Sequence, residues 1–344
     1  MSYVASHDNC LYAQHHALQL WQSAQRFDMD MAGLRRASKL CADDFLDKDR
    51  LISPEQYLNL LQHMARSLNS SDTSFILGQH MLPGHYGYAS QALLHAQNLR
   101  QALHILVQFQ SSLCPLLTPR LKEENGQMIL YWMDQWGAPA MLPFLVEMHM
   151  TAVTAMCRWL SEKRLPWRYC FNRSRASHIE QHQVHLGRDL RFDCYLDAMI
   201  IPSEYLDLTW PRGNEVSAQL AVQQATRELM SESKKIPQAQ SIIPQLYDYL
   251  ALNLRCAPSL ENAAHYFECS SATFKRHLAR HGTHFQAELD QVRTHMVLYL
   301  FHFQGMDNEA VASYLGFHDA TNFRRSFKRW TGLTPSALRF ALDR

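Results

Sequence analysis

The sequence predicts an α+β N-terminal domain, built from helices and antiparallel strands, followed by an all-α domain with two helix-turn-helix units. Three observations lead to this prediction. The 344 residues exceed the usual size of one domain. Strand and hairpin signals interrupt the helical periodicity between residues 116 and 201. Beyond residue 240, two pairs of short helices carry basic outer faces.

Helical signals fill the first hundred residues. Ser53 precedes Pro54, which pairs an N-cap serine with a proline at the first helical position. Tyr57 and Leu60 then follow at helical spacing. Residues 83–90 contain two glycines but lack the lysine and the preceding strand of a phosphate-binding loop, so we interpret them as a tight turn before a helix.

A β-hairpin and further strands follow. Residues 119–124 and 127–133 flank Asn125 and Gly126, and this dipeptide between two strand-like runs is a strong hairpin signal. Residues 167–171 alternate aromatic and polar side chains and predict another strand, and residues 198–201 predict one more. Residues 143–160 predict a helix, so helices should cover one side of a few antiparallel strands.

The N-terminal part contains no recognisable catalytic motif. Phosphate-loop, dinucleotide-binding, nucleophile-elbow and zinc-protease patterns are all missing from the sequence, so we expect no enzyme activity and no cofactor. His178, His182 and His185 are spaced to share one helix face and could bind zinc. No acidic or cysteine ligand stands beside them, so a solvated polar face is the preferred interpretation and no metal site is predicted.

The two domains are expected to meet at a polar linker. Residues 231–241 are mostly polar and include Pro237, which would break a continuing helix. We therefore assign residues 1–230 and 241–344 to the two domains and residues 231–240 to the linker. An apolar stripe before the linker predicts a helix that packs on its own domain, with a second subunit as the alternative: Ala218, Ala221, Val222, Ala225 and Leu229.

The first helix-turn-helix unit begins at Ser259, which caps a short helix. Ser270 starts the second helix, in which Phe274 and Leu278 face inward by their period. The outer face of this second helix carries polar and basic side chains, as a helix that enters the major groove requires: Thr273, Lys275, Arg276 and Arg280.

The second unit repeats this arrangement. Residues 307–315 form a helix that ends at Gly316, and Asp319 caps the next helix. Its buried face is aromatic, whereas its outer face carries four positive charges: Arg324, Arg325, Lys328 and Arg329. A basic run on the second helix of such a unit favours contact with phosphates and bases.

A longer helix, residues 284–302, is expected between the two units. Its roughly 19 residues span nearly 30 Å, close to the ~34 Å of one turn of B-DNA. One chain can therefore present two recognition helices to successive major-groove segments on the same face of the duplex.

The run from Gly316 to Arg339 closely resembles the signature of the AraC family of bacterial transcription regulators. The resemblance covers residues 240–344 strongly. It extends to the N-terminal part through residues 52–57, 84–102 and 187–192, which look like the non-cupin effector-binding domain of one branch of the family. It implies a DNA-binding activator or repressor whose first domain senses a small organic molecule.

The resemblance also implies functional residues. In the second unit the family reads bases from positions that match Thr321, Asn322 and Arg325, with Arg324 and Lys328 suited to phosphates. The matching positions of the first unit, with a lysine beside them, are Ser271, Ala272, Thr273, Lys275 and Arg276. Glu268 departs from the family pattern, because glycine is frequent at that turn. Ser271 and Ala272 replace larger or basic residues, so Thr273 and Arg276 would carry more of the readout.

These observations predict a sequence-specific DNA-binding transcription regulator controlled by a small organic effector. The alternative is an enzyme, or a domain that only dimerises, fused to a DNA-binding tail. The expected partners are double-stranded promoter DNA, an effector with apolar or amphipathic surface, and RNA polymerase, with a homodimer left open. The longest apolar stretch is interrupted by Pro143, Glu147 and Arg158, and no secretory pattern is visible, so we expect a cytoplasmic protein without a membrane anchor.

Overall fold

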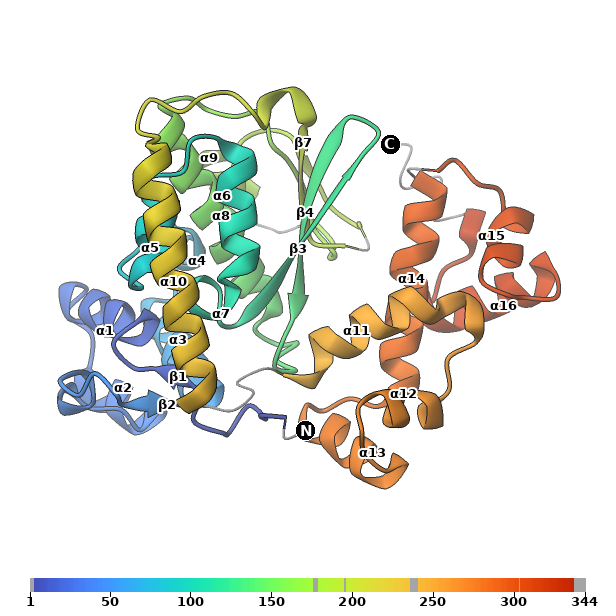
Figure 1. The fold of residues 1–344 in the computed structure, drawn as a ribbon, viewed down its shortest axis with the longest axis horizontal. Helices are drawn as coiled ribbons and strands as arrows, with labels where there is room; N and C mark the ends of the chain where they lie inside the picture. The colour runs from blue at the N-terminus through green and yellow to red at the C-terminus, as the bar shows by residue number, and fades with distance from the viewer. Residues whose placement is uncertain (1–2, 176–178, 195, 236–240, 303, 337–344) are drawn as a thin grey trace.

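The computed structural model describes residues 3–175, 179–194, 196–235, 241–302 and 304–336 (Figure 1). The N-terminal part is α+β and the C-terminal part is helical, which confirms the predicted fold class. No helix of these residues is long and apolar enough to cross a membrane. The predicted linker lies only partly within the described residues, because 236–240 fall outside them.

The chain begins with short helices and one small antiparallel strand pair. These elements are β1 (Leu11–Tyr12), α1 (His16–Arg26), α2 (Met31–Ser38), β2 (Leu51–Ile52), α3 (Pro54–Leu68), α4 (Thr73–Gln79), α5 (Tyr88–Leu94), α6 (Leu99–Gln108) and α7 (Gln110–Leu113). The predicted cap of α3 is confirmed, since Ser53 Oγ accepts a hydrogen bond from the Gln56 backbone N–H at 3.1 Å. The tight turn before α5 is confirmed as well, with positive φ at both of its glycines, Gly84 and Gly87.

A five-stranded sheet forms the centre of the N-terminal domain. Its strand order is β3-β4-β7-β5-β6, with β3 (Leu117–Glu124), β4 (Gln127–Asp134), β5 (Arg168–Cys170), β6 (Leu190–Arg191) and β7 (Ala198–Pro202). Asn125 and Gly126 both have positive φ, 49° and 71°, and form the two-residue turn of the predicted hairpin. The predicted antiparallel pairing is confirmed for β3, β4, β7 and β5, and one edge of the sheet adds a parallel pair. There β5 and β6 pair in parallel, because α9 (Ile179–His185) provides a crossover between them.

The two faces of the sheet belong to different cores. On β4, Met128, Leu130 and Trp132 pack into the core of the N-terminal domain, which includes α8 (Leu142–Ser161). The alternate residues Tyr131 and Met133 pack with the C-terminal helices instead. This alternation follows from the two-residue period of a strand, and it joins the two domains through one hairpin.

Helix α10 (Glu215–Lys235) runs beside α5 on the outer side of the N-terminal domain (Figure 1). Ala218, Ala221 and Ala225 are buried, and Val222 and Leu229 are half-buried against the same core. The preferred interpretation of the apolar stripe, packing on its own domain, is therefore confirmed.

The C-terminal part consists of α11 (Ile242–Asn253), α12 (Leu260–Tyr266), α13 (Ser271–Arg280), α14 (Phe285–His302), α15 (Asn308–Tyr314) and α16 (Ala320–Thr331). Helices α11 and α14 pack together between the α12–α13 pair and the α15–α16 pair (Figure 1). Helix α14 has 18 residues, so it spans about 27 Å.

The histidines of α9 differ from the predicted solvated face. His182 is only 3% exposed, and its Nε2 lies 3.1 Å from Glu147 Oε1 and 3.0 Å from Arg173 Nη2. His185 stacks on Phe75 with 4.9 Å between the ring centroids. His178 lies outside the described residues. The predicted solvated face is therefore wrong for His182, because the half-buried Arg173 and Glu147 offer it polar partners that the local sequence does not reveal. Within the part of the chain that the structure describes, no three His, Cys, Asp or Glu side chains gather where they could hold a metal ion.

Candidate nucleic-acid interface

The first helix-turn-helix unit is built from α12 and α13. Ser259 Oγ accepts from the Asn262 N–H at 3.1 Å, and Ser270 Oγ accepts from the Thr273 N–H at 3.1 Å, so both predicted caps are present. Phe267, at the end of α12, stacks on the fully buried Phe274 of α13 with ring centroids 5.4 Å apart. This aromatic contact fixes the angle between the two helices and leaves the opposite face of α13 outward.

The turn of this unit contains a strained residue. Glu268 has φ 53°, and the next N–H, that of Cys269, donates to the Ala264 carbonyl at 3.0 Å. The second unit has the same geometry, with Gly316 at φ 74° and the Phe317 N–H 2.8 Å from the Ala312 carbonyl. A left-handed residue ends the first helix of both units, and glycine is the residue type that adopts this conformation without steric cost.

We expect Glu268→Gly to stabilise the C-terminal helices by about 0.5–1 kcal/mol, because it relieves this left-handed strain. Thermal and urea unfolding of the full chain will measure the change. Gly316→Ala is the matched opposite substitution and should destabilise by about 1 kcal/mol. An unfolding midpoint that falls in the Glu268→Gly variant would contradict the interpretation.

The second unit is built from α15 and α16 on an aromatic core. Phe323 and Phe327 of α16 are fully buried, with ring centroids 5.8 Å apart. Asp319 caps α16 by accepting from the Asn322 N–H at 2.7 Å, and this hydrogen bond lowers the pKa of the Asp319 carboxyl. The Asn322 side-chain amide also donates to Asp319, at 3.0 Å.

The predicted DNA-contacting residues all lie on α13 and α16. Ser271 and Thr273 are half-buried, and the remaining ones are exposed: Ala272, Lys275, Arg276, Thr321, Asn322, Arg324, Arg325 and Lys328. Arg324 Nε donates to the Ala320 carbonyl at 3.2 Å, which holds its guanidinium along the helix. Across the described ranges, none of these cationic side chains has a carboxylate oxygen within 4.0 Å. Arg280 and Arg329 add two further exposed charges to the same helices.

The hairpin of the N-terminal domain contacts α11 and α14 directly. Arg120 Nη2 lies 2.8 Å from Asp248 Oδ2 of α11, and burial raises the pKa of this aspartate while Arg120 opposes the rise. The Lys122 ammonium lies over the Tyr299 ring of α14, 2.9 Å from its centroid. The Tyr299 hydroxyl donates a hydrogen bond to Glu124. We call this contact the hairpin seam. The sequence contains no signal for it, because its residues lie far apart along the chain.

A second contact between the domains lies at the end of α13. Tyr3 packs edge-on against Phe267 and His277, with centroid distances of 5.8 and 5.9 Å. A Cβ atom on Gly137 would lie 2.1 Å from the His281 carbonyl oxygen, so only glycine allows this approach of the two backbones. The N-terminal domain thus touches the first helix-turn-helix unit without covering the exposed side chains of its second helix.

Known protein families match both the N-terminal and the C-terminal part of the chain. The family described as the arabinose-binding domain of AraC transcription regulators matches residues 29–210, more than half of the chain, and a helix-turn-helix domain family matches residues 263–340. The Ornithine utilization regulator of Pseudomonas aeruginosa is 26% identical over 285 residues, which cover 82% of this chain and 83% of that protein. The HTH-type transcriptional regulator VqsM of the same species is 28% identical over 82 residues, 24% of this chain and 25% of its own.

Among solved structures, the transcriptional regulator CdpR from Pseudomonas aeruginosa covers 97% of this chain and 100% of its own, with 18% identity and a TM-score of 0.46. The family matches account for both the α+β domain and the paired helix-turn-helix units. The chain belongs to the AraC family and is a DNA-binding transcription regulator with an N-terminal ligand-binding domain.

Proposed function

We propose that the chain binds promoter DNA through α13 and α16 together and that a small organic effector in the N-terminal domain controls this binding. The observation that carries the proposal is the repetition of one geometry. In each unit a residue with positive φ ends the first helix, and a side chain caps the start of the second helix. The outer face of that second helix carries cationic side chains that pair with no carboxylate of the described residues. Such faces suit two neighbouring segments of the major groove.

The residues divide into two roles. Those that read base edges are Ser271, Ala272, Thr273, Arg276, Thr321, Asn322 and Arg325. Those that bind phosphates are Lys275, Arg324 and Lys328. An arginine can pair bidentately with a guanine edge, whereas a lysine acts as a point charge on the backbone. The domain boundaries, residues 1–230 and 241–344 around the linker 231–240, belong to the same proposal.

The hairpin seam offers the route from effector to DNA. A ligand shifts an equilibrium only by its different affinity for two states, so some contact must differ between them. Helix α11 connects to the linker and α14 connects the two helix-turn-helix units, and the seam holds both against the sensing domain. A change in the sheet would therefore reach the relative position of α13 and α16.

Charge reversal at the seam tests this route. Arg120→Glu places two carboxylates together, so we expect amide hydrogen exchange in α11 and the hairpin to rise by about fivefold or more. The double variant Arg120→Glu with Asp248→Arg restores the pair and should restore the protection. Exchange that is unchanged in the single variant, or equally raised in the double variant, would show that this ion pair does not hold the domains together.

The proposed function is tested with the full chain and a metabolite library. A compound at 100 times its dissociation constant stabilises the protein by about 2.7 kcal/mol, which a thermal-shift screen detects. The name of the Ornithine utilization regulator supports the inclusion of amino acids in this library. We expect a compound that raises the unfolding temperature to change promoter affinity as well. If no amino acid, organic acid or sugar changes either quantity, control by a small effector is wrong.

A further inference from the structure

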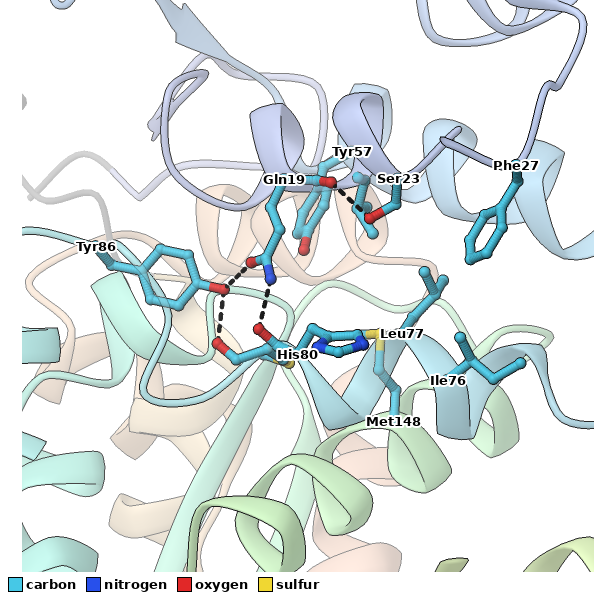
Figure 2. A pocket seen from close by; sticks show the side chains of 11 residues that line it. Gln19, Ser23, Phe27, Tyr57, Ile76, Leu77, His80, Tyr86 and Met148 are labelled. Atoms are coloured by element: carbon cyan, nitrogen blue, oxygen red, sulfur yellow. Dashed lines mark hydrogen bonds between the residues drawn. The ribbon is translucent and has the colours of Figure 1, made fainter. Parts of the chain in front are cut away.

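An enclosed cavity of the N-terminal domain is too small for an effector. It lies between α1, α3 and α4 and measures about 30 Å³, the volume of roughly one water molecule (Figure 2). Several of its polar groups already have partners. The Tyr86 hydroxyl lies 2.6 Å from Gln19 Oε1 and 2.8 Å from the Met81 carbonyl, and Gln19 Nε2 donates to the His80 carbonyl. The cavity therefore has no space for an organic ligand.

A larger cleft is also lined by His80. It opens between the end of α8, α4, α9 and the loop before α10, with a volume of about 560 Å³. Pockets for small ligands usually measure about 300–1,000 Å³. Arg158, Trp159, Glu162, His185 and Arg212 line the cleft.

The lining of this cleft is rich in hydrogen-bond donors. Arg158 has no carboxylate within 4.0 Å among the described residues, and Arg212 has only a 3.6 Å contact with Glu162. The Gln79 side-chain nitrogen lies 2.8 Å from His185 Nδ1, which leaves Nε2 of that ring as the N–H donor. Burial lowers the pKa of His185, so the ring is neutral near neutral pH. Arg158, Arg212 and His185 therefore offer hydrogen-bond donors to the cleft, whereas Glu162 is the acidic side chain in its lining.

The cleft also has an aromatic surface. Trp159 is 44% exposed, and the Arg212 guanidinium lies 5.0 Å from its ring. A neighbouring open hollow holds two arginines and two acids: Arg164, Arg188, Glu180 and Asp189. Asp189 also pairs with Arg168 at 3.1 Å, so this hollow has a surplus of positive charge as well. Its tryptophan, Trp167, is only 4% exposed. The exposed indole beside two arginines therefore distinguishes the first cleft.

We propose that the cleft at Arg158, Trp159 and Arg212 is the effector site and that it takes a small organic carboxylate. The carboxylate binds the two guanidinium groups, and the flat or apolar body of the ligand lies against the indole. Guanidinium groups recognise carboxylates through paired hydrogen bonds, and their planes also stack on aromatic rings. The assignment rests on the proposed function, in which the N-terminal domain binds an effector.

Occupancy of this cleft can reach the DNA-binding helices. Arg158 belongs to α8, whereas Arg212 stands three residues before α10, so a carboxylate held by both ties the two helices together. Thr154, which also lines the cleft, shares a 2.8 Å hydrogen bond with the Tyr169 hydroxyl of β5. Strand β5 pairs with β7, which pairs with the hairpin strand β4. The ligand therefore touches elements that continue to the linker and to the hairpin seam.

Benzoate tests the site, with benzyl alcohol and benzylamine as neutral and cationic analogues of the same shape. We expect saturation-transfer NMR on the full chain to detect benzoate with an affinity about tenfold or more above that of either analogue. Arg158→Ala and Arg212→Ala should each weaken benzoate binding by about tenfold. Glu162→Gln should strengthen it by about threefold, because it removes a carboxylate that competes for Arg212. Arg188→Ala, the control in the neighbouring hollow, should change nothing.

Three results would overturn the assignment: no benzoate binding, equal binding of benzylamine, or benzoate binding that survives the double variant Arg158→Ala with Arg212→Ala. Failure of the proposed function looks different. If a metabolite controls promoter binding equally in the wild type and in this double variant, effector control stands and the cleft is not its site. If no metabolite changes promoter binding in the wild type, the proposed function itself fails.

Discussion

Acidification from about pH 7 to about pH 5 should destabilise the protein by several kcal/mol. His149, His281 and His295 are responsible, because burial lowers the pKa of each to about 4. In the unfolded chain each ring has a pKa of about 6.5, so between pH 6.5 and pH 4 the unfolded state binds protons that the folded state excludes. Each histidine then costs about 2 kcal/mol of stability at about pH 5.

The surroundings of these rings explain why they stay neutral. His149 Nδ1 lies 2.7 Å from the Leu145 carbonyl, and its ring stands 5.3 Å from that of Trp132. His295 Nδ1 lies 3.0 Å from the Tyr247 hydroxyl. Within the described part of the chain, no acidic side chain acts on either ring to stabilise an imidazolium. Buried carboxyls with raised pKa values act in the opposite direction and offset part of this loss, because the folded state takes up their protons above their ordinary values near 4: Asp134, Asp197 and Glu288.

Urea unfolding at several pH values measures this dependence. His149→Gln should remove about one third of the loss between pH 7 and pH 5, whereas the exposed control His104→Gln should leave the slope unchanged. NMR titration of the histidine ring protons gives a second readout if the buried variant folds poorly. A free energy of unfolding that stays constant or increases on acidification would show that these rings are already protonated in the folded protein.

Arg325→Ala and Lys328→Ala should impair DNA binding in different ways. Both side chains are exposed on α16 one turn apart, so each serves as the control for the other. Loss of a bidentate arginine–guanine contact removes about 1–3 kcal/mol of discrimination between the cognate site and random DNA. Loss of a phosphate contact weakens binding to both DNAs alike and lowers the salt slope by about one.

Fluorescence anisotropy with a selected site and with random DNA, each at several salt concentrations, separates the two effects. Equal losses on both DNAs for both variants would refute the division into base-reading and phosphate-binding residues. Unchanged binding in both variants would remove α16 from the interface.

Features with local causes could be predicted from the sequence. The turn at Asn125 and Gly126 needs two positive φ values, which these residue types adopt readily. Ser270 and Asp319 satisfy the free N–H groups at the starts of α13 and α16, and both caps lie within three residues of their partners. The outward faces of α13 and α16, which we propose contact DNA, follow from the helical period, because the buried aromatics determine which side chains point outward.

Features that depend on distant parts of the chain could not be predicted. Arg120 and Asp248 are separated by 128 residues. In the sequence, neither can be distinguished from an ordinary surface charge. His182 is buried by Glu147 and Arg173 from other elements, so its spacing to neighbouring histidines gave the wrong interpretation. The cleft at Arg158 and Arg212 likewise combines segments that only the fold brings together.

Hydroxyl-radical footprinting of the full chain on a selected DNA site tests the central claim most directly, namely that one chain uses both recognition helices. We expect two protected segments about one helical turn, roughly 10 base pairs, apart on the same face of the duplex. Arg325→Ala should weaken protection in one segment and Arg276→Ala in the other. A single protected segment, weakened by one variant and unaffected by the other, would contradict joint binding by α13 and α16.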